Sequence, residues 1–79
     1  MQIDTLSEII LPDGVIRFQM EIPSASFLYV GFLLESFEGV CLYTTPDRKK
    51  NVMQIDVVPD YKQQFLQLLK TLKDFDISK

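Results

Sequence analysis

The clearest alternation of apolar and polar residues lies between positions 15 and 22 (VIRFQMEI). Every second residue is apolar, which is the period of a strand that buries one face. The apolar face comprises Ile16, Phe18, Met20 and Ile22. A weaker alternation occupies residues 5–11. The intervening Pro12-Asp13-Gly14 favours a turn, because proline fixes φ and glycine tolerates positive φ, so the two segments are predicted to form a hairpin.

Eight consecutive apolar residues (FLYVGFLL, 27–34) follow this strand. A short apolar run fits a strand or a helix, but the flanking residues favour a helix. Ser24 or Ser26 would cap its start, and Gly39 in a left-handed conformation would stop it near Phe37 or Glu38. A helix of a small domain needs only one apolar stripe, whereas this one is apolar nearly all round. Part of its surface should therefore lack cover.

The second half of the chain repeats the strand and helix signals. Residues 40–44 and 52–58 are strand-like and are joined by a polar loop, 45–51. Asp60 follows Pro59 and would cap a final helix, with Gln63 at the capping-box spacing. One face of that helix is apolar, with Tyr61, Phe65, Leu68, Leu69 and Leu72.

The element order is strand-strand-helix-strand-strand-helix over one domain, residues 1–79. It predicts an α+β fold, a two-layer sandwich in which two helices cover one face of a four-stranded antiparallel sheet. This ββαββα order is a ferredoxin-like variant whose N-terminal hairpin strand replaces the usual last strand. A right-handed crossover places residues 40–44 parallel to 15–22, with 52–58 between them. If Val40 and Leu42 face the helices, Cys41 and Tyr43 lie on the open sheet face.

Composition excludes several classes of protein. The net charge of -3 argues against nucleic acid, whose binders usually carry a basic surface. A single cysteine excludes an internal disulfide. No basic N-terminal region precedes an apolar run, and the eight-residue run is too short to cross a bilayer. We therefore expect a cytoplasmic domain without membrane contact.

The chain contains no histidine, the commonest general base and metal ligand. Cys41 has no such partner, so a packed or silent thiol is favoured over a reactive one. Glu35 and Glu38 are three residues apart, but a solvated helix end explains them better than an acid–base pair. Asp56 and Asp60 are better explained as an outward strand residue and a helix cap than as Mg²⁺ ligands. We predict no catalytic residues, metal ligands or cofactor, and no enzymatic activity.

Three segments carry a resemblance to a known family. They are LLESFEGV (33–40), Thr44-Thr45 with Asp47, and Val57-Val58-Pro59-Asp60 before a leucine-rich helix. Over residues 15–72 the chain resembles a family of short bacterial domains of unknown function. The resemblance implies no assigned activity. The topology is also similar to ACT-like amino-acid-binding domains, but the glycine usual between their first strand and first helix is absent here.

The leading functional hypothesis is a self-associating or partner-binding domain. Its interface would lie on the outward side of the first helix and comprise Leu28, Tyr29, Phe32 and Leu33. Gly31 within that helix would allow the close approach of a neighbour. A homodimer is the simplest way to cover this patch. The competing explanation is that residues 1–10 fold over the helix.

Two alternatives belong to other classes. A small-molecule sensor would bind an amino acid or anion at a dimer interface, with Ser24 and Ser26 at a helix start as candidate anion ligands. A weak RNA-contacting domain would use Tyr43 and the basic run Arg48, Lys49 and Lys50, which are also candidate anion ligands. A solvated hairpin loop is the commoner explanation of such a run.

Overall fold

The computed structural model describes residues 2–74, and for Cys41, Asp47 and Arg48 it describes the backbone alone. The strands are β1 (Asp4–Ile10), β2 (Ile16–Glu21), β3 (Val40–Asp47) and β4 (Val52–Val57). The helices are α1 (Phe27–Glu35) and α2 (Lys62–Asp74), and the 3-10 turns are η1 (Ser24–Ser26), η2 (Arg48–Lys50) and η3 (Pro59–Tyr61). This order confirms the predicted ββαββα arrangement.

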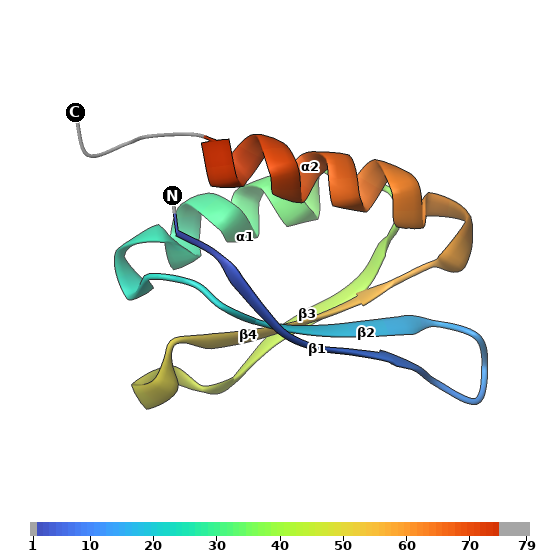
Figure 1. The fold of residues 1–79 in the computed structure, drawn as a ribbon, viewed down its shortest axis with the longest axis horizontal. Coiled ribbons are helices and arrows are strands. Elements are labelled where there is room, and N and C mark those ends of the chain that lie inside the picture. Colours follow the sequence, from blue (N-terminus) through green and yellow to red (C-terminus); the bar gives the residue numbers. More distant parts are fainter. Residues whose placement is uncertain (1, 75–79) are drawn as a thin grey trace.

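The four strands form one sheet in the order β1-β2-β4-β3, with every neighbouring pair antiparallel. Strand β3 therefore runs parallel to β2 with β4 between them, as predicted. Both helices lie on the same face of the sheet (Figure 1). The fold is a ferredoxin-like α+β sandwich in which β1 occupies the edge next to β2, and β1 and β3 are the two edge strands.

The predicted apolar face of β2 forms the centre of the core. Phe18 is 1% exposed and its ring centroid lies 4.9 Å from that of Phe65 on α2. On the β1 side, Lys62 Nζ donates to Glu8 Oε2 at 3.0 Å. The buried apolar residues are Ile3, Ile16, Phe18, Met20, Ile22, Val30, Leu34, Met53, Ile55, Val57, Phe65, Leu69 and Leu72. Helix α2 thus covers the β1–β2 half of the sheet.

The predicted hairpin between β1 and β2 is confirmed. Gly14 has φ +92°, the conformation that glycine adopts without steric cost. Its N–H donates to the Leu11 carbonyl at 2.8 Å, and the Val15 N–H donates to Asp13 Oδ1 at 3.0 Å. These bonds close the turn and fix the register of the two strands.

The predicted limits of the first helix are wrong in detail. Ser26 precedes α1 but makes no side-chain capping bond, and Ser24 lies inside η1, which precedes the helix. The helix ends at Glu35, because the Ser36 hydroxyl donates to the carbonyls of Phe32 and Leu33 at 3.1 and 3.0 Å. These carbonyls belong to the last turn, and the Phe32 carbonyl also accepts from the Ser36 backbone N–H at 3.3 Å.

Gly39 does not supply a left-handed stop, since Gly14 is the glycine with positive φ in the described residues. The small size of Gly39 is needed instead for close packing, because an added Cβ would overlap the Tyr61 Cβ. Asp60 is also not the predicted cap. It lies inside η3, which follows Val58 and begins with Pro59, and no side-chain capping bond is made there.

Candidate interaction surface

A β-bulge near the start of β3 determines which residues face the helices. Val40 pairs with Val57 of β4, but the next paired residue, Leu42, faces Asp56. The extra residue reverses the alternation, since side chains on a strand switch faces at every position. Leu42 therefore lies on the open face with Asp56, and Tyr43 opposite Ile55 faces the helices. The predicted placement of Leu42 and Tyr43 is wrong for this reason.

Tyr43 packs beneath α1. An added Cβ on Gly31 would lie 3.4 Å from the Tyr43 hydroxyl oxygen, so the neighbour of Gly31 is a ring of the same chain. The hydroxyl donates to Glu35 Oε1 at 2.7 Å. This bond, together with desolvation and the nearby carboxylate charge, raises the pKa of Tyr43 above its ordinary value of 10.0. Helix α1 is thereby attached to the outer strand of the sheet.

The outward side of α1 carries exposed apolar side chains, as predicted. Leu28 is 79% exposed, Phe32 68% and Tyr29 39%. Leu33 differs, because it is partly buried against the core. The competing explanation, in which residues 1–10 fold over α1, is wrong. Residues 4–10 form β1 at the edge of the sheet opposite β3, beside β2.

Two hollows of about 220 and 250 Å³ lie between α1 and β3. Both are lined by Glu35 and Tyr43, so they adjoin each other, and we call the two hollows together the α1–β3 groove. Leu28 and Phe32 line it on the helix side, and Leu42 lines it on the strand side. The exposed apolar residues of α1 therefore border the unpaired edge of the sheet.

The open face of the sheet carries polar side chains that bond to one another. Arg17 Nε and Nη2 donate to Asp56 Oδ1 and Oδ2 at 2.9 and 3.1 Å, and this hydrogen bonding raises the pKa of Arg17. Gln19 Nε2 donates to Gln54 Oε1 at 2.9 Å. With Tyr43 on the other face, the aromatic residue expected for RNA stacking is absent from this part of the described structure.

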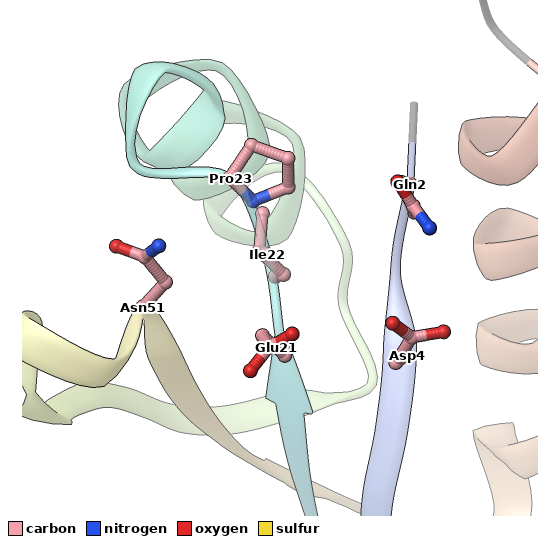
Figure 2. Close-up of a pocket in the computed structure, with 6 residues that line it drawn as sticks. All are labelled: Gln2, Asp4, Glu21, Ile22, Pro23 and Asn51. Carbon is pink, nitrogen blue, oxygen red and sulfur yellow. The ribbon is translucent and has the colours of Figure 1, made fainter.

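A third hollow, of about 290 Å³, lies at the end of β1 and β2 (Figure 2). Asp4 and Glu21, which face each other across the two strands, both line it. So do Pro23, the residue before η1, and Asn51, the residue after η2. Two carboxylates thus share this hollow with residues that adjoin η1 and η2, the turns that carry the predicted anion ligands.

The predicted anion ligands lie in two separate turns. Ser24 and Ser26 belong to η1, where Ser26 is buried and Ser24 is exposed. Lys49 and Lys50 are exposed in η2, at the far end of β3. The nearby carboxylates oppose anion binding by repulsion.

The acidic residues considered from the sequence have different partners or surroundings in the structure. Glu38 lies beyond the end of α1 and accepts a 3.4 Å bond from the Tyr61 hydroxyl, whereas Glu35 accepts from Tyr43. Asp56 is engaged by Arg17, and Asp60 is exposed. Among the residues whose side chains the structure describes, no three His, Cys, Asp or Glu residues gather as a metal site would require. The Cys41 side chain lies outside what the structure describes.

The helices in the described part of the chain are too short or too polar to cross a membrane. Residues 20–75 match the model of a family described as a domain of unknown function, DUF4911. The chain belongs to this family, and the match runs from the end of β2 through α2. Neither the curated proteins nor the solved structures include a match.

Proposed function

We propose that this domain is a non-catalytic binding module that self-associates through the α1–β3 groove. The observation that carries the proposal is the position of Leu28 and Phe32. They are 79% and 68% exposed and lie on the side of α1 that borders the unpaired edge strand. Exposed apolar patches beside polar rims are typical of protein interfaces.

The size of the patch suits the centre of a dimer interface. A free aromatic side chain offers about 150–250 Å² of surface, so Phe32, Leu28 and Tyr29 on the outward side of α1 together present on the order of 300 Å² per chain. A standard interface buries about 800 Å² per partner, with an apolar centre and a polar rim. The patch would supply that centre, and the charged residues near the ends of β3 would supply the rim.

The observations favour a protein partner over a small molecule or RNA. The hollows are open, and their volumes of about 220–290 Å³ fall below the usual ligand pocket of about 300–1,000 Å³. The sheet face lacks the stacking residue that motivated the RNA alternative. The carboxylates of Glu35, Asp56 and Glu38 already accept bonds from Tyr43, Arg17 and Tyr61. This supports a role without acid–base chemistry.

The proposal is tested by Phe32→Glu, with Ile10→Glu as the matched control. Ile10 is 72% exposed on β1, away from the groove. Ile10→Glu therefore replaces an exposed apolar side chain by a carboxylate, as Phe32→Glu does, but outside the proposed interface. Analytical ultracentrifugation of the parent protein and the two variants would measure self-association. We expect a dimer for the parent and the control and a monomer for Phe32→Glu. Equal association of the two variants would overturn the proposal.

A further inference from the structure

The two edge strands differ in the charge that they carry along their length. Strand β1 carries the carboxylates Asp4 and Glu8, and charges on an edge discourage further pairing. Residues 40–45 of β3 (VCLYTT) contain no charge. Register shifts between Val40 and Leu42 and between Thr44 and Asp47, together with Pro46, which lacks an N–H, restrict regular pairing to the middle of the strand. We propose that β3 pairs antiparallel with β3 of a second copy, which creates one eight-stranded sheet. This inference rests on the proposed self-association and specifies its geometry.

The helix layer supports this geometry. Strands lie about 4.8 Å apart and a helix is about 10 Å wide, so each helix spans two strands. Helix α2 packs on β2 and contacts β1 through Lys62 and Glu8, while α1 covers Tyr43 of β3. A two-fold axis at the paired β3 strands would therefore set the two α1 helices about 10 Å apart, a normal packing distance. Leu28 and Phe32 would then meet their counterparts across the axis.

Charge complementarity selects a second copy as the occupant. The start of β3 is acidic, with Glu35 at the end of α1 and Glu38 in the connection. The turn after β3 is basic, with Lys49 and Lys50 exposed in η2. Antiparallel pairing about the middle of β3 places Val40 of one chain opposite Asp47 of the other. The Glu38 end of each copy then approaches the η2 turn of the other, so the favourable contact forms twice.

Charge reversal tests this arrangement through its symmetry. In Glu38→Lys the cation at position 38 would face Lys50 of the other copy, and in Lys50→Glu the carboxylate at position 50 would face Glu38 of the other copy. Each variant therefore places like charges opposite each other at both symmetric contacts. We expect each to self-associate about tenfold more weakly than the parent at low salt. An equimolar mixture restores opposite charges at both contacts. We therefore expect a heterodimer with parent-like affinity, formed only on mixing.

Carbodiimide cross-linking, which joins a carboxylate to a nearby amine, tests the contact between Glu38 and Lys50 of two copies independently. Within one chain, Glu38 and Lys50 lie at opposite ends of an eight-residue strand, about 26 Å apart. A bond between them would therefore join two chains, which mixed ¹⁴N and ¹⁵N protein would reveal by mass spectrometry. The Glu8–Lys62 pair, at 3.0 Å within one chain, is the internal positive control.

The outcomes separate the two proposals. Restored association on mixing, with the isotope-mixed Glu38–Lys50 product, supports strand pairing. Two variants that dimerise like the parent, gain nothing on mixing and give no such product would overturn strand pairing. If Phe32→Glu is monomeric in that case, self-association through α1 stands. A parent chain that stays monomeric at low salt and high concentration would overturn both.

Discussion

The ring of Tyr43 lies directly beneath Gly31, with its hydroxyl oxygen 3.4 Å from where a Cβ at position 31 would lie. One residue belongs to edge strand β3 and the other to the middle of α1. The β-bulge after Val40 turns Tyr43 toward this helix. This contact and the Tyr43–Glu35 hydrogen bond tie the apolar side of α1 to the sheet edge, and so create the α1–β3 groove.

Two glycines are expected to respond oppositely to alanine. At Gly31 the new Cβ meets Tyr43 at 3.4 Å, ordinary van der Waals contact, so helix propensity should dominate. We expect Gly31→Ala to raise the free energy of unfolding by about 0.5–1 kcal/mol. At Gly39 the Cβ would overlap Tyr61, and Gly39→Ala should lower it by about 1–3 kcal/mol. Urea unfolding measures both, and the same sign for the two changes would contradict the packing described here.

Removal of the Phe18 ring from the centre of the core should strongly lower the free energy of unfolding. Phe18 is 1% exposed and stacks obliquely on Phe65, so Phe18→Ala leaves a cavity between the sheet and α2. We expect a loss of about 3–5 kcal/mol in the free energy of unfolding. The half-exposed Ile9 on β1 provides the control, since Ile9→Ala removes little buried surface. A cost below about 1 kcal/mol for Phe18→Ala would place the ring outside the core.

The Arg17–Asp56 pair should show strong coupling. Asp56 is only 7% exposed, so Arg17→Ala leaves a largely buried carboxylate with no cation beside it. We therefore expect Arg17→Ala to lower the free energy of unfolding. Replacing both residues, as Arg17→Met with Asp56→Leu, should cost less than the two single changes together. A double-mutant cycle by thermal or urea unfolding measures the difference, and additive costs would show that the pair is not coupled.

The raised pKa of Tyr43 makes stability depend on alkaline pH. The hydrogen bond to Glu35 and the adjacent carboxylate favour the protonated phenol in the folded state. The contribution is therefore complete below the unfolded pKa of about 10 and is lost as pH rises through the higher folded value. We expect the advantage of the parent over Tyr43→Phe to shrink above pH 10 in urea unfolding. A difference that stays constant from pH 8 to 11 would contradict this.

Hydrophobic periodicity predicted most of the fold because the two half-buried central strands and α2 each show one clear period. The alternation around Phe18 and the apolar stripe around Phe65 specify which faces meet. Local irregularities of a strand could not be predicted from the periodicity. A bulge at residue 41 leaves no mark in a short apolar strand, yet it exchanges the faces of Leu42 and Tyr43.

The candidate surface was predicted in part for the same reason. An apolar run longer than one stripe identifies Leu28 and Phe32 as outward residues, but it does not show that Leu33 returns to the core. The ends of α1 were also missed. Ser36 competes for the last carbonyls of the helix, and Gly39 is required by Tyr61, which is distant in sequence. Such contacts depend on the tertiary fold.

The most direct test of self-association is sedimentation equilibrium of the parent chain across a wide concentration range at low salt. The chain has a mass of 9.2 kDa. We expect the apparent mass to rise with concentration to twice this value, and Phe32→Glu to remain at the monomer mass under the same conditions. A parent chain whose mass stays at 9.2 kDa up to hundreds of micromolar, with no effect of Phe32→Glu, would contradict the proposed function.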